Sequence, residues 1–337
     1  MSSFNFNYTK IESIADLKGI SMNKESFWQS PLWAEILIKT QQADVFVVQN
    51  DKNSILIERR SIWKGYSGLY ILGIRPTLIT EDLIGSIRDN IASEKDLFLQ
   101  IEPLGDDTDN SFSFELFQSH AAPFRRFIEP VTALLNLTTP KEELLASFAE
   151  KGRYNIRLAQ KRWVTARWVR WLDKYNDTTY LDAFYRLLDE TTKRDGFAHN
   201  SLTYYKHFVE TLESQNAWGL LIAEKEGTLH AAGIFAYFGD MAIYYYGASS
   251  SDTAIRRDMA TYLLQWNAME EGIRRWCTTY DFLGISADGK GKLAGVTEFK
   301  LRFNPEKKHW MSERVMIFKP FTLKVLQFIS RIRKIFR

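Results

Sequence analysis

The segment between residues 217 and 283 limits the possible folds more than any other part of this sequence. It contains three strand-like apolar runs, at 217–223, 229–238 and 241–248. The pairs Glu226-Gly227 and Gly239-Asp240 separate these runs, and such short glycine turns connect neighbouring antiparallel strands. A helical pattern over 256–271 ends at Gly272 and precedes a further strand at 278–283. This order predicts an α/β (α+β) protein with mixed central sheets flanked by helices.

The first part of the chain also mixes helix and strand patterns. Ser30-Pro31 begins a predicted helix that runs through Lys39, since proline is tolerated in the first turn of a helix. Strands are predicted at 44–48, 55–61 and 97–101. A helix, or a pair of helices, starts after Thr138-Thr139-Pro140. We therefore expect three parts, namely a domain of residues 1–140, a second domain of residues 141–312 and a C-terminal helix of residues 313–337.

Charge is distributed unevenly along the chain. The 44 basic and 41 acidic side chains give a net charge of +3, and the 45% of hydrophobic residues are enough for packed domains. Residues 151–170 and residues 314–337 each contain seven basic residues and no acidic one. The rest of the chain is therefore acidic, and the two cationic stretches are the candidate binding surfaces.

Redox and targeting signals indicate a cytoplasmic protein. Cys277 is the one cysteine, which excludes an intrachain disulfide, and we expect a small buried side chain there. The N-terminus lacks the basic-then-apolar order of a secretory signal. No uncharged apolar run approaches the roughly 20 residues needed to span a bilayer. The five histidines are scattered without carboxylates at ligand spacing, so no metal site is expected.

Two segments are similar to known cofactor-binding motifs, and both depart from them. The loop 284–291 nearly spells a phosphate-binding loop, but Gly291 stands where a magnesium-ligating Ser or Thr is needed. The order of meander, helix and strand is that of the GCN5-related N-acetyltransferases (GNAT), whose coenzyme A enzymes carry an Arg/Gln-x-x-Gly-x-Gly/Ala turn. Met259 and Thr261 occupy the glycine positions of that turn. We therefore expect no cofactor.

The basic stretch 151–170 has two interpretations. It is either a solvated helix face or a surface for nucleic-acid phosphates. Aromatic residues that suit base stacking lie between its cations or directly after them: Tyr154, Trp163, Trp168 and Trp171. The composition gives the two interpretations equal weight.

The same stretch resembles a known family. The sequence KGRYNIRLAQKRWV at 151–164 is similar to the Fem family of aminoacyl-tRNA-dependent transferases, which build the interpeptide bridges of bacterial peptidoglycan. Further similar segments follow in the family's order: QSPLWAEIL (29–37), LQIEP (99–103), EPVTALLNLTTPKEELLASF (129–148), RDGF (194–197), YYYGASS (244–250), YLLQWNAMEEG (262–272), YDFLGI (280–285) and EFKLRF (298–303). The resemblance is to the compact members, because no heptad segment for a coiled-coil arm is present.

The resemblance implies a fold, a reaction and partners. It implies two GNAT-like domains, an aminoacyl-tRNA as donor, and a peptidoglycan precursor as acceptor, which is lipid-linked or nucleotide-linked and supplies a stem-peptide amino group. We expect the enzyme to act as a monomer. In such a reaction a neutral amine attacks an activated ester, so the site needs a donor for the oxyanion and an acceptor for the amine proton.

The expected residues of the reaction site come from three segments. Lys300, in EFKLRF, matches the family's lysine after phenylalanine and is expected to contact the oxyanion or the tRNA terminus. Its alternative role is a surface lysine on an edge strand. Catalytic Tyr246 and substrate-binding Tyr244 alternate along one strand, which predicts that both phenols enter the site from one face while Tyr245 points into the core. Glu102 is the expected base or amine anchor, with capping of a loop as the alternative.

The remaining expected contacts are with the two substrates. The candidates for tRNA lie in the signature helix: Lys151, Arg153, Arg157, Lys161 and Arg162. Interdomain ion pairing is the alternative role for Arg153 and Arg157. The candidates for the phosphates of the precursor are Lys39, Tyr204 and Tyr205. The acceptor contacts depart from the family's pattern, since YILGIRPTL (70–78) lacks its Gly-Pro step and the lysine expected just after Trp33-Ala34 comes late.

The C-terminal segment has an amphipathic pattern. Its apolar residues recur at helical spacing: Phe321, Val325, Phe328, Ile332 and Phe336. The other side carries Lys324, Gln327, Arg331 and Lys334. Residues 319–337 either pack on their own domain or contact anionic lipid headgroups at the inner face of the plasma membrane.

Two further functional hypotheses stand beside aminoacyl-tRNA-dependent transfer. One is an acyl-coenzyme A-dependent N-acyltransferase on the same fold. The other is a non-catalytic relative that binds tRNA or membrane.

Overall fold

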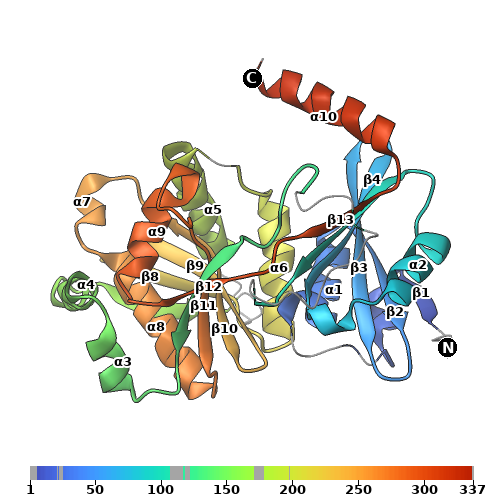
Figure 1. The fold of residues 1–337 in the computed structure, drawn as a ribbon. Helices are drawn as coiled ribbons and strands as arrows, with labels where there is room; N and C mark the ends of the chain where they lie inside the picture. Colours follow the sequence, from blue (N-terminus) through green and yellow to red (C-terminus); the bar gives the residue numbers. More distant parts are fainter. Residues whose placement is uncertain are drawn as a thin grey trace. The chain divides into compact units, whose positions relative to one another are not determined.

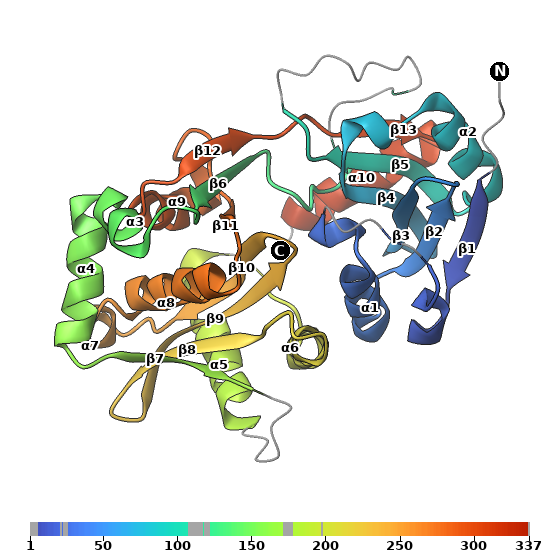
Figure 2. The ribbon, with the colours of Figure 1, turned by 90° about the horizontal axis from the view of Figure 1, so that it is seen from below.

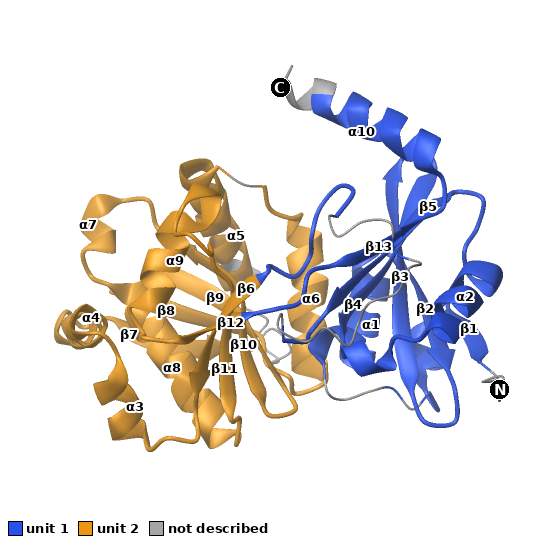
Figure 3. Ribbon diagram, in the orientation of Figure 1, with its two compact units in different colours: residues 1–130, 309–337 blue, residues 131–308 orange. Residues whose placement is uncertain are grey.

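Two compact units make up the chain (Figure 3). The computed structural model describes residues 6–20, 22, 26–106, 117, 122–170, 178–196 and 198–335. One unit comprises residues 1–130 and 309–337, and the other comprises residues 131–308. This division differs from the expected boundaries at 140 and 312. Strand β6 (Val131–Asn136) pairs with β11 (Thr279–Gly284) in the second unit, whereas β13 (Arg314–Ile317) pairs with β5 (Asp96–Pro103) in the first.

The first unit is built on a six-stranded sheet in the order β1-β2-β3-β4-β5-β13 (Figure 1). Its other strands are β1 (Asn7–Ile11), β2 (Asp44–Gln49), β3 (Ser54–Trp63) and β4 (Tyr66–Ile74). β4 and β5 are parallel and stay paired along their length, from Ser67 opposite Asp96 to Ile74 opposite Pro103. The other neighbours are antiparallel. The strands predicted at 44–48, 55–61 and 97–101 are confirmed.

The described residues of the first unit also form three α-helices. In α1 (Pro31–Thr40), Ser30 is the N-cap and its hydroxyl accepts the N–H of Trp33 at 3.1 Å, which confirms the predicted helix start. Helix α2 (Glu81–Asn90) buries Leu83, Ile84 and Ile87. Helix α10 (Pro320–Ile335) follows β13. Short 3₁₀ turns lie at Ile14–Leu17, Phe27–Gln29 and Pro76–Leu78.

The second unit contains a seven-stranded mixed sheet in the order β12-β6-β11-β10-β9-β8-β7. Its other strands are β7 (Thr165–Val169), β8 (Leu220–Lys225), β9 (Thr228–Phe238), β10 (Met241–Ser249) and β12 (Glu306–His309). The predicted meander is confirmed as β8-β9-β10, whose neighbours are antiparallel. β11 joins β10 in parallel after the intervening helix, as the predicted order requires.

Helices cover both faces of this sheet (Figure 2). The helices described for this unit are α3 (Lys141–Ser147), α4 (Glu150–Lys161), α5 (Thr178–Asp195), α6 (Leu202–Ser214), α7 (Thr253–Arg256), α8 (Ala260–Arg274) and α9 (Ala294–Leu301), with a 3₁₀ turn at Gly291–Leu293. Helix α8 and the apolar face of α4 share one core with Phe235, Phe282 and Phe303. Helices α5 and α6 pack on the opposite face. The helix predicted over 256–271 is divided, because Met259 adopts a left-handed φ of 55° before α8.

No helix in the described part of the chain combines the length and the apolar content that crossing a membrane requires.

Candidate active site

The parallel strands β10 and β11 separate from each other part of the way along the second unit's sheet (Figure 2). They are paired from Met241 opposite Thr279 to Ile243 opposite Asp281. Beyond this last pair β10 continues beside β9, while β11 continues beside β6. The corresponding strands β4 and β5 of the first unit stay paired throughout. Separation of two parallel strands leaves main-chain groups without ladder partners, so this position can take polar ligands.

Lys300 lies at this separation. Its Nζ donates to the carbonyl oxygens of Gly284 at 2.7 Å and Leu283 at 3.4 Å, two residues just beyond the last β10–β11 pair. Lys300 belongs to helix α9 and is 6% exposed. The alternative role of Lys300, as a surface lysine on an edge strand, is therefore wrong. A buried ammonium group at this position places a positive charge where the sheet opens.

Asp281 and Leu283 form the support of this lysine. Leu283 has a left-handed φ of 57°, which is strained for a residue with a side chain. Asp281 Oδ1 accepts the Leu283 N–H at 2.7 Å and also the hydroxyl of Thr132. Burial raises the pKa of the Asp281 carboxyl, and the charge of Lys300 acts in the opposite direction. Sequence reasoning did not select Asp281, although the segment YDFLGI contains it.

A pair of tyrosine hydroxyls lies on the α6 side of the same region. Tyr246 follows the last β10–β11 pair by three residues, and its hydroxyl lies 2.9 Å from that of Tyr204 in α6. Burial, together with the adjacent Tyr204, raises the pKa of Tyr246 well above its ordinary value. Tyr246 is therefore a neutral phenol near neutral pH, able to donate and to accept a hydrogen bond.

Tyr244 does not share a face with Tyr246, so the predicted alternation is wrong. A β-bulge shifts the register, so that Tyr244 lies opposite Phe235 while Tyr246 lies opposite Ile234. Tyr244 consequently stacks on Phe235 in the α8 core, with ring centroids 5.3 Å apart. Tyr245 packs against Phe208 of α6, on the same side as Tyr246.

The phosphate candidates Tyr205 and Lys39 are already engaged within the protein. Tyr205 is 1% exposed, and its hydroxyl accepts the N–H of Asn200 at 3.3 Å. As folded, it is not accessible to a phosphate. Lys39 Nζ lies 2.6 Å from Glu35 Oε1, one turn earlier in α1, so its charge is balanced within its own helix.

Glu102 anchors a loop within the first unit. It is 1% exposed and accepts the main-chain N–H groups of Phe127 at 3.0 Å and Ile128 at 2.6 Å, together with the side-chain amide of Gln100 at 2.6 Å. Burial raises the pKa of this carboxyl, and the hydrogen bonds oppose the effect. This geometry favours the loop-capping alternative over the expected role as a base.

Helix α4 presents one exposed basic face. Lys151, Arg157 and Lys161 are exposed, together with Tyr154 at 60%. At 100° per residue these four side chains lie within about a third of the helix circumference. Trp163 follows the helix, is 82% exposed and has a left-handed φ of 62°. A large apolar ring held in water at a strained position is costly, so it suggests a function.

Two arginines of the signature helix have structural contacts instead. Arg153 donates to the carbonyls of Ala146 and Phe148, at the end of α3. Arg162 donates to the carbonyl of Arg257 and lies 3.2 Å from Asp258. Trp168 stacks on Trp218 at 4.6 Å, and Trp171 lies outside the described residues.

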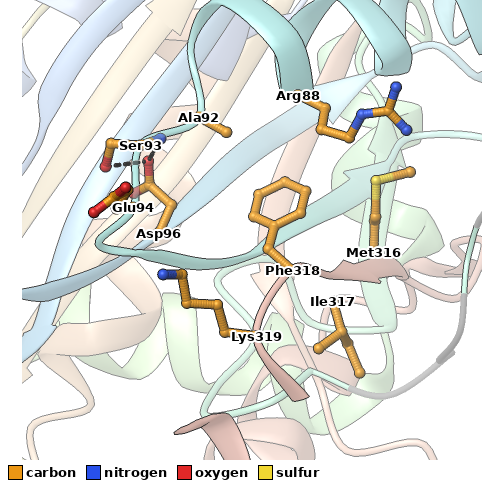
Figure 4. A pocket seen from close by; sticks show the side chains of 9 residues that line it. All are labelled: Arg88, Ala92, Ser93, Glu94, Asp96, Met316, Ile317, Phe318 and Lys319. Atoms are coloured by element: carbon orange, nitrogen blue, oxygen red, sulfur yellow. Dashed lines mark hydrogen bonds between the residues drawn. The ribbon is translucent and has the colours of Figure 1, made fainter. Parts of the chain in front are cut away.

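A pocket of about 500 Å³ lies elsewhere, in the first unit (Figure 4). It is lined by Arg88, Ala92, Ser93, Glu94, Asp96, Met316, Ile317, Phe318 and Lys319. Its buried carboxylate, Asp96, accepts hydrogen bonds from Arg59, Ser67 and Ser93. This satisfied carboxylate has a structural role, and the pocket brings no catalytic group together.

Within the described part of the chain, neither the cysteine nor the histidines form a metal site or a reactive thiol. Cys277 is 4% exposed as predicted, and burial raises the pKa of its thiol to about 11. Among the residues that the structure describes, no three His, Cys, Asp or Glu side chains are grouped so that they could hold a metal ion.

Solved structures show the same fold. FemX has a TM-score of 0.73 and 18% identity over 95% of this chain and 100% of that one. A conserved protein of unknown function from Bacteroides thetaiotaomicron has a TM-score of 0.57 and 13% identity over 94% and 100%. The C-terminal domain of a putative lysylphosphatidylglycerol synthetase from Agrobacterium fabrum has a TM-score of 0.53 and 12% identity over 88% and 90%. No curated protein matches the chain in sequence.

Two helix-flanked mixed sheets, one with separated parallel strands, place the chain in the class of GNAT-like folds. The sequence profile of the FemAB family matches residues 117–226 and 219–331. The chain belongs to the FemAB family.

Proposed function

We propose that this protein transfers an amino acid from aminoacyl-tRNA to an amino group on the stem peptide of a peptidoglycan precursor. The observation that carries the proposal is the buried Lys300 ammonium at the separation of β10 and β11, in a chain of the FemAB family. The name of the structural relative FemX points to the same group of enzymes.

The reaction forms one peptide bond and breaks one ester bond. The neutral amine of the acceptor attacks the ester carbonyl, and the carbonyl oxygen becomes an oxyanion. The ribose oxygen then leaves and takes up a proton, while the amine loses one. Lys300 stabilises the oxyanion or the tRNA terminus, because a buried cation interacts strongly with a developing negative charge. Tyr246 orients the acceptor, and Tyr204 holds the Tyr246 hydroxyl in place.

The donor is recognised through the basic face of α4. Lys151, Arg157 and Lys161 provide phosphate contacts, and Trp163 offers an exposed ring for stacking. Met259 and Thr261 stand where coenzyme A enzymes carry glycines, and their side chains hinder close approach of a pyrophosphate to the main chain. This favours a tRNA donor over the alternative, an acyl-coenzyme A-dependent N-acyltransferase.

The direct test supplies the protein with charged tRNA and with a nucleotide-linked or a lipid-linked muropeptide. We expect transfer that ribonuclease abolishes. Transfer from acyl-coenzyme A, insensitive to ribonuclease, would establish the alternative instead.

A second arm tests the site itself. Lys300→Met should lower kcat by about 10²–10³-fold, the usual effect of removing one oxyanion donor. The matched control is Lys292→Met, an exposed lysine shortly before α9. Wild-type transfer by Lys300→Met would refute the assigned role.

A further inference from the structure

Helix α10 exposes the apolar side that its sequence pattern defines. Phe321 is 82% exposed, Val325 is 40% exposed and Phe328 is 64% exposed. These residues follow the spacing i, i+4, i+7, so they form one continuous stripe on the helix. Ile332 and Phe336, which continue the pattern, lie where side chains are not described.

A different set of residues holds α10 on its own unit. Leu323 and Leu326 are 3% and 7% exposed, and Gln327 donates to the carbonyl of Pro123 at 2.8 Å. Packing of α10 on its own unit therefore uses Leu323 and Leu326, and it leaves the stripe of Phe321, Val325 and Phe328 in water.

Cations border this stripe, and the segment carries no acidic residue. Lys324 and Arg331 are exposed and lie on one flank of the stripe at 100° per residue. The whole stretch from residue 314 to residue 337 contains seven basic residues and no acidic one. An aromatic stripe flanked by cations matches an anionic bilayer surface, which offers acyl chains to the rings and phosphates to the cations.

We propose that α10 is a preformed membrane-surface helix, which seats Phe321 and Phe328 at the headgroup boundary of an anionic phospholipid bilayer. The folded unit already fixes the orientation of the helix, so little ordering is required on binding. An RNA partner is a poorer fit, because the apolar centre of the stripe offers no group that could hydrogen-bond to a base or a phosphate. The proposal goes beyond the function proposed above and does not depend on it. It would bring the enzyme to the surface where a lipid-linked acceptor resides.

The test is flotation of the full chain with vesicles of phosphatidylcholine alone, or of phosphatidylcholine mixed with phosphatidylglycerol. We expect binding to the mixed vesicles, weakened by salt, and little binding to the neutral ones. The double variant Phe321→Ser/Phe328→Ser should lose at least about tenfold in affinity. Lys324→Glu/Arg331→Glu should lose roughly fivefold for each cation removed, and more for the reversal of charge.

Matched controls lie away from the helix. Trp276→Ser removes an aromatic residue that is 88% exposed, and Lys18→Glu/Lys52→Glu reverses two exposed charges in the same unit as α10. Both controls should bind as the wild type does, and circular dichroism should show that every variant is folded. Equal binding to both kinds of vesicle, or unchanged binding by the phenylalanine variant, would overturn the proposal. A phenylalanine variant that lost self-association or tRNA affinity but kept its vesicle binding would also overturn the proposal.

Transfer to a nucleotide-linked muropeptide distinguishes a failure of the membrane proposal from a failure of the proposed function. The α10 variants should retain this transfer, because the acceptor is then soluble. An inactive protein that still binds vesicles would refute the proposed function and leave the membrane proposal standing.

Discussion

The hydroxyl oxygens of Tyr204 and Tyr246 lie 2.9 Å apart, although Tyr204 belongs to helix α6 and Tyr246 to strand β10. This contact depends on the β-bulge between Tyr244 and Tyr246, which turns Tyr246 toward α6. The pair lies beside the strand separation, and its role can be tested directly.

We expect Tyr204→Phe and Tyr246→Phe each to reduce kcat/KM by about fivefold, and the double variant to lose little more. Both single changes break the same hydrogen bond, whose net contribution is about 1 kcal/mol. Steady-state kinetics should show the effect of Tyr204→Phe mainly in KM, since Tyr204 positions Tyr246. Tyr244→Phe is the contrast, because Tyr244 lies in the core on the opposite face. Additive losses in the double variant would contradict the coupling.

Glu102 is expected to behave as a structural anchor. Glu102→Gln replaces one acceptor oxygen by an NH₂ group, which cannot accept a hydrogen bond. Oε2 accepts the N–H groups of Phe127 and Ile128, while Oε1 accepts the side-chain amide of Gln100, so in either orientation at least one buried donor loses its acceptor. Urea unfolding should show a loss of about 1–3 kcal/mol, the cost of unsatisfied buried groups. If Glu102 were the catalytic base, kcat would fall by about 10²-fold or more with unchanged stability.

Two helical glycines are expected to respond to alanine in opposite directions. In α4, a Cβ at Gly152 would lie 2.2 Å from the carbonyl oxygen of Arg302, so Gly152→Ala should destabilise the protein by about 1–3 kcal/mol. In α2, Gly85 has no atom within 4 Å of its added Cβ, so Gly85→Ala should stabilise by about 0.5–1 kcal/mol. Urea unfolding of the two variants compares them directly. The same sign for both would show that helix propensity outweighs the close approach of Arg302.

The exposed cations of α4 should determine the salt dependence of tRNA binding. Replacing Lys151, Arg157 and Lys161 by alanine should reduce the slope of log Kd against log salt by about two, since each phosphate contact contributes about 0.7–0.9. Replacing the exposed lysines Lys18, Lys52 and Lys95 of the first unit should leave the slope unchanged. Trp163→Ala should weaken binding by about 1–3 kcal/mol without changing the slope, as expected for a stacking residue. An unchanged slope in the α4 variant would show that tRNA binds to another surface of the protein.

Alkaline pH should destabilise the second unit. Burial raises the pKa of Tyr205 to about 12, whereas the unfolded chain releases this proton near its ordinary value of 10. The folded state therefore holds more protons between pH 10 and 12, and its stability falls as the pH rises through this interval. One such tyrosine accounts for up to about 3 kcal/mol. Urea unfolding across this range should show a smaller slope for Tyr205→Phe.

Local patterns predicted most of the elements correctly. The meander of β8, β9 and β10, the capped start of α1 and the buried Cys277 all follow from the periodicity and chemistry of neighbouring residues. The similarity of residues 151–164 to the Fem family led to the family that the profile match establishes. These features are local, so a single sequence is sufficient to indicate them.

The site could be predicted only in part, because its geometry depends on non-local contacts. The choice of Lys300 came from a motif, but its burial depends on how α9 packs against the end of β11. Strict alternation predicted that Tyr244 and Tyr246 share one face of the strand. The β-bulge between them places the two side chains on opposite faces. Asp281 was missed because a single aspartate in a strand gives no sign that it will hold a strained Leu283.

The sequence by itself determined the order of the elements, the two cationic stretches and the family of the chain. Only the tertiary structure decided that β13 returns to the first sheet, that β10 and β11 separate, and which sides of β10 and α10 carry their aromatic residues. The physical reason is that periodicity reports which residues share a face of one element. The partner that this face meets, or the water that it is left in, depends on strand pairing and packing between residues far apart in the chain.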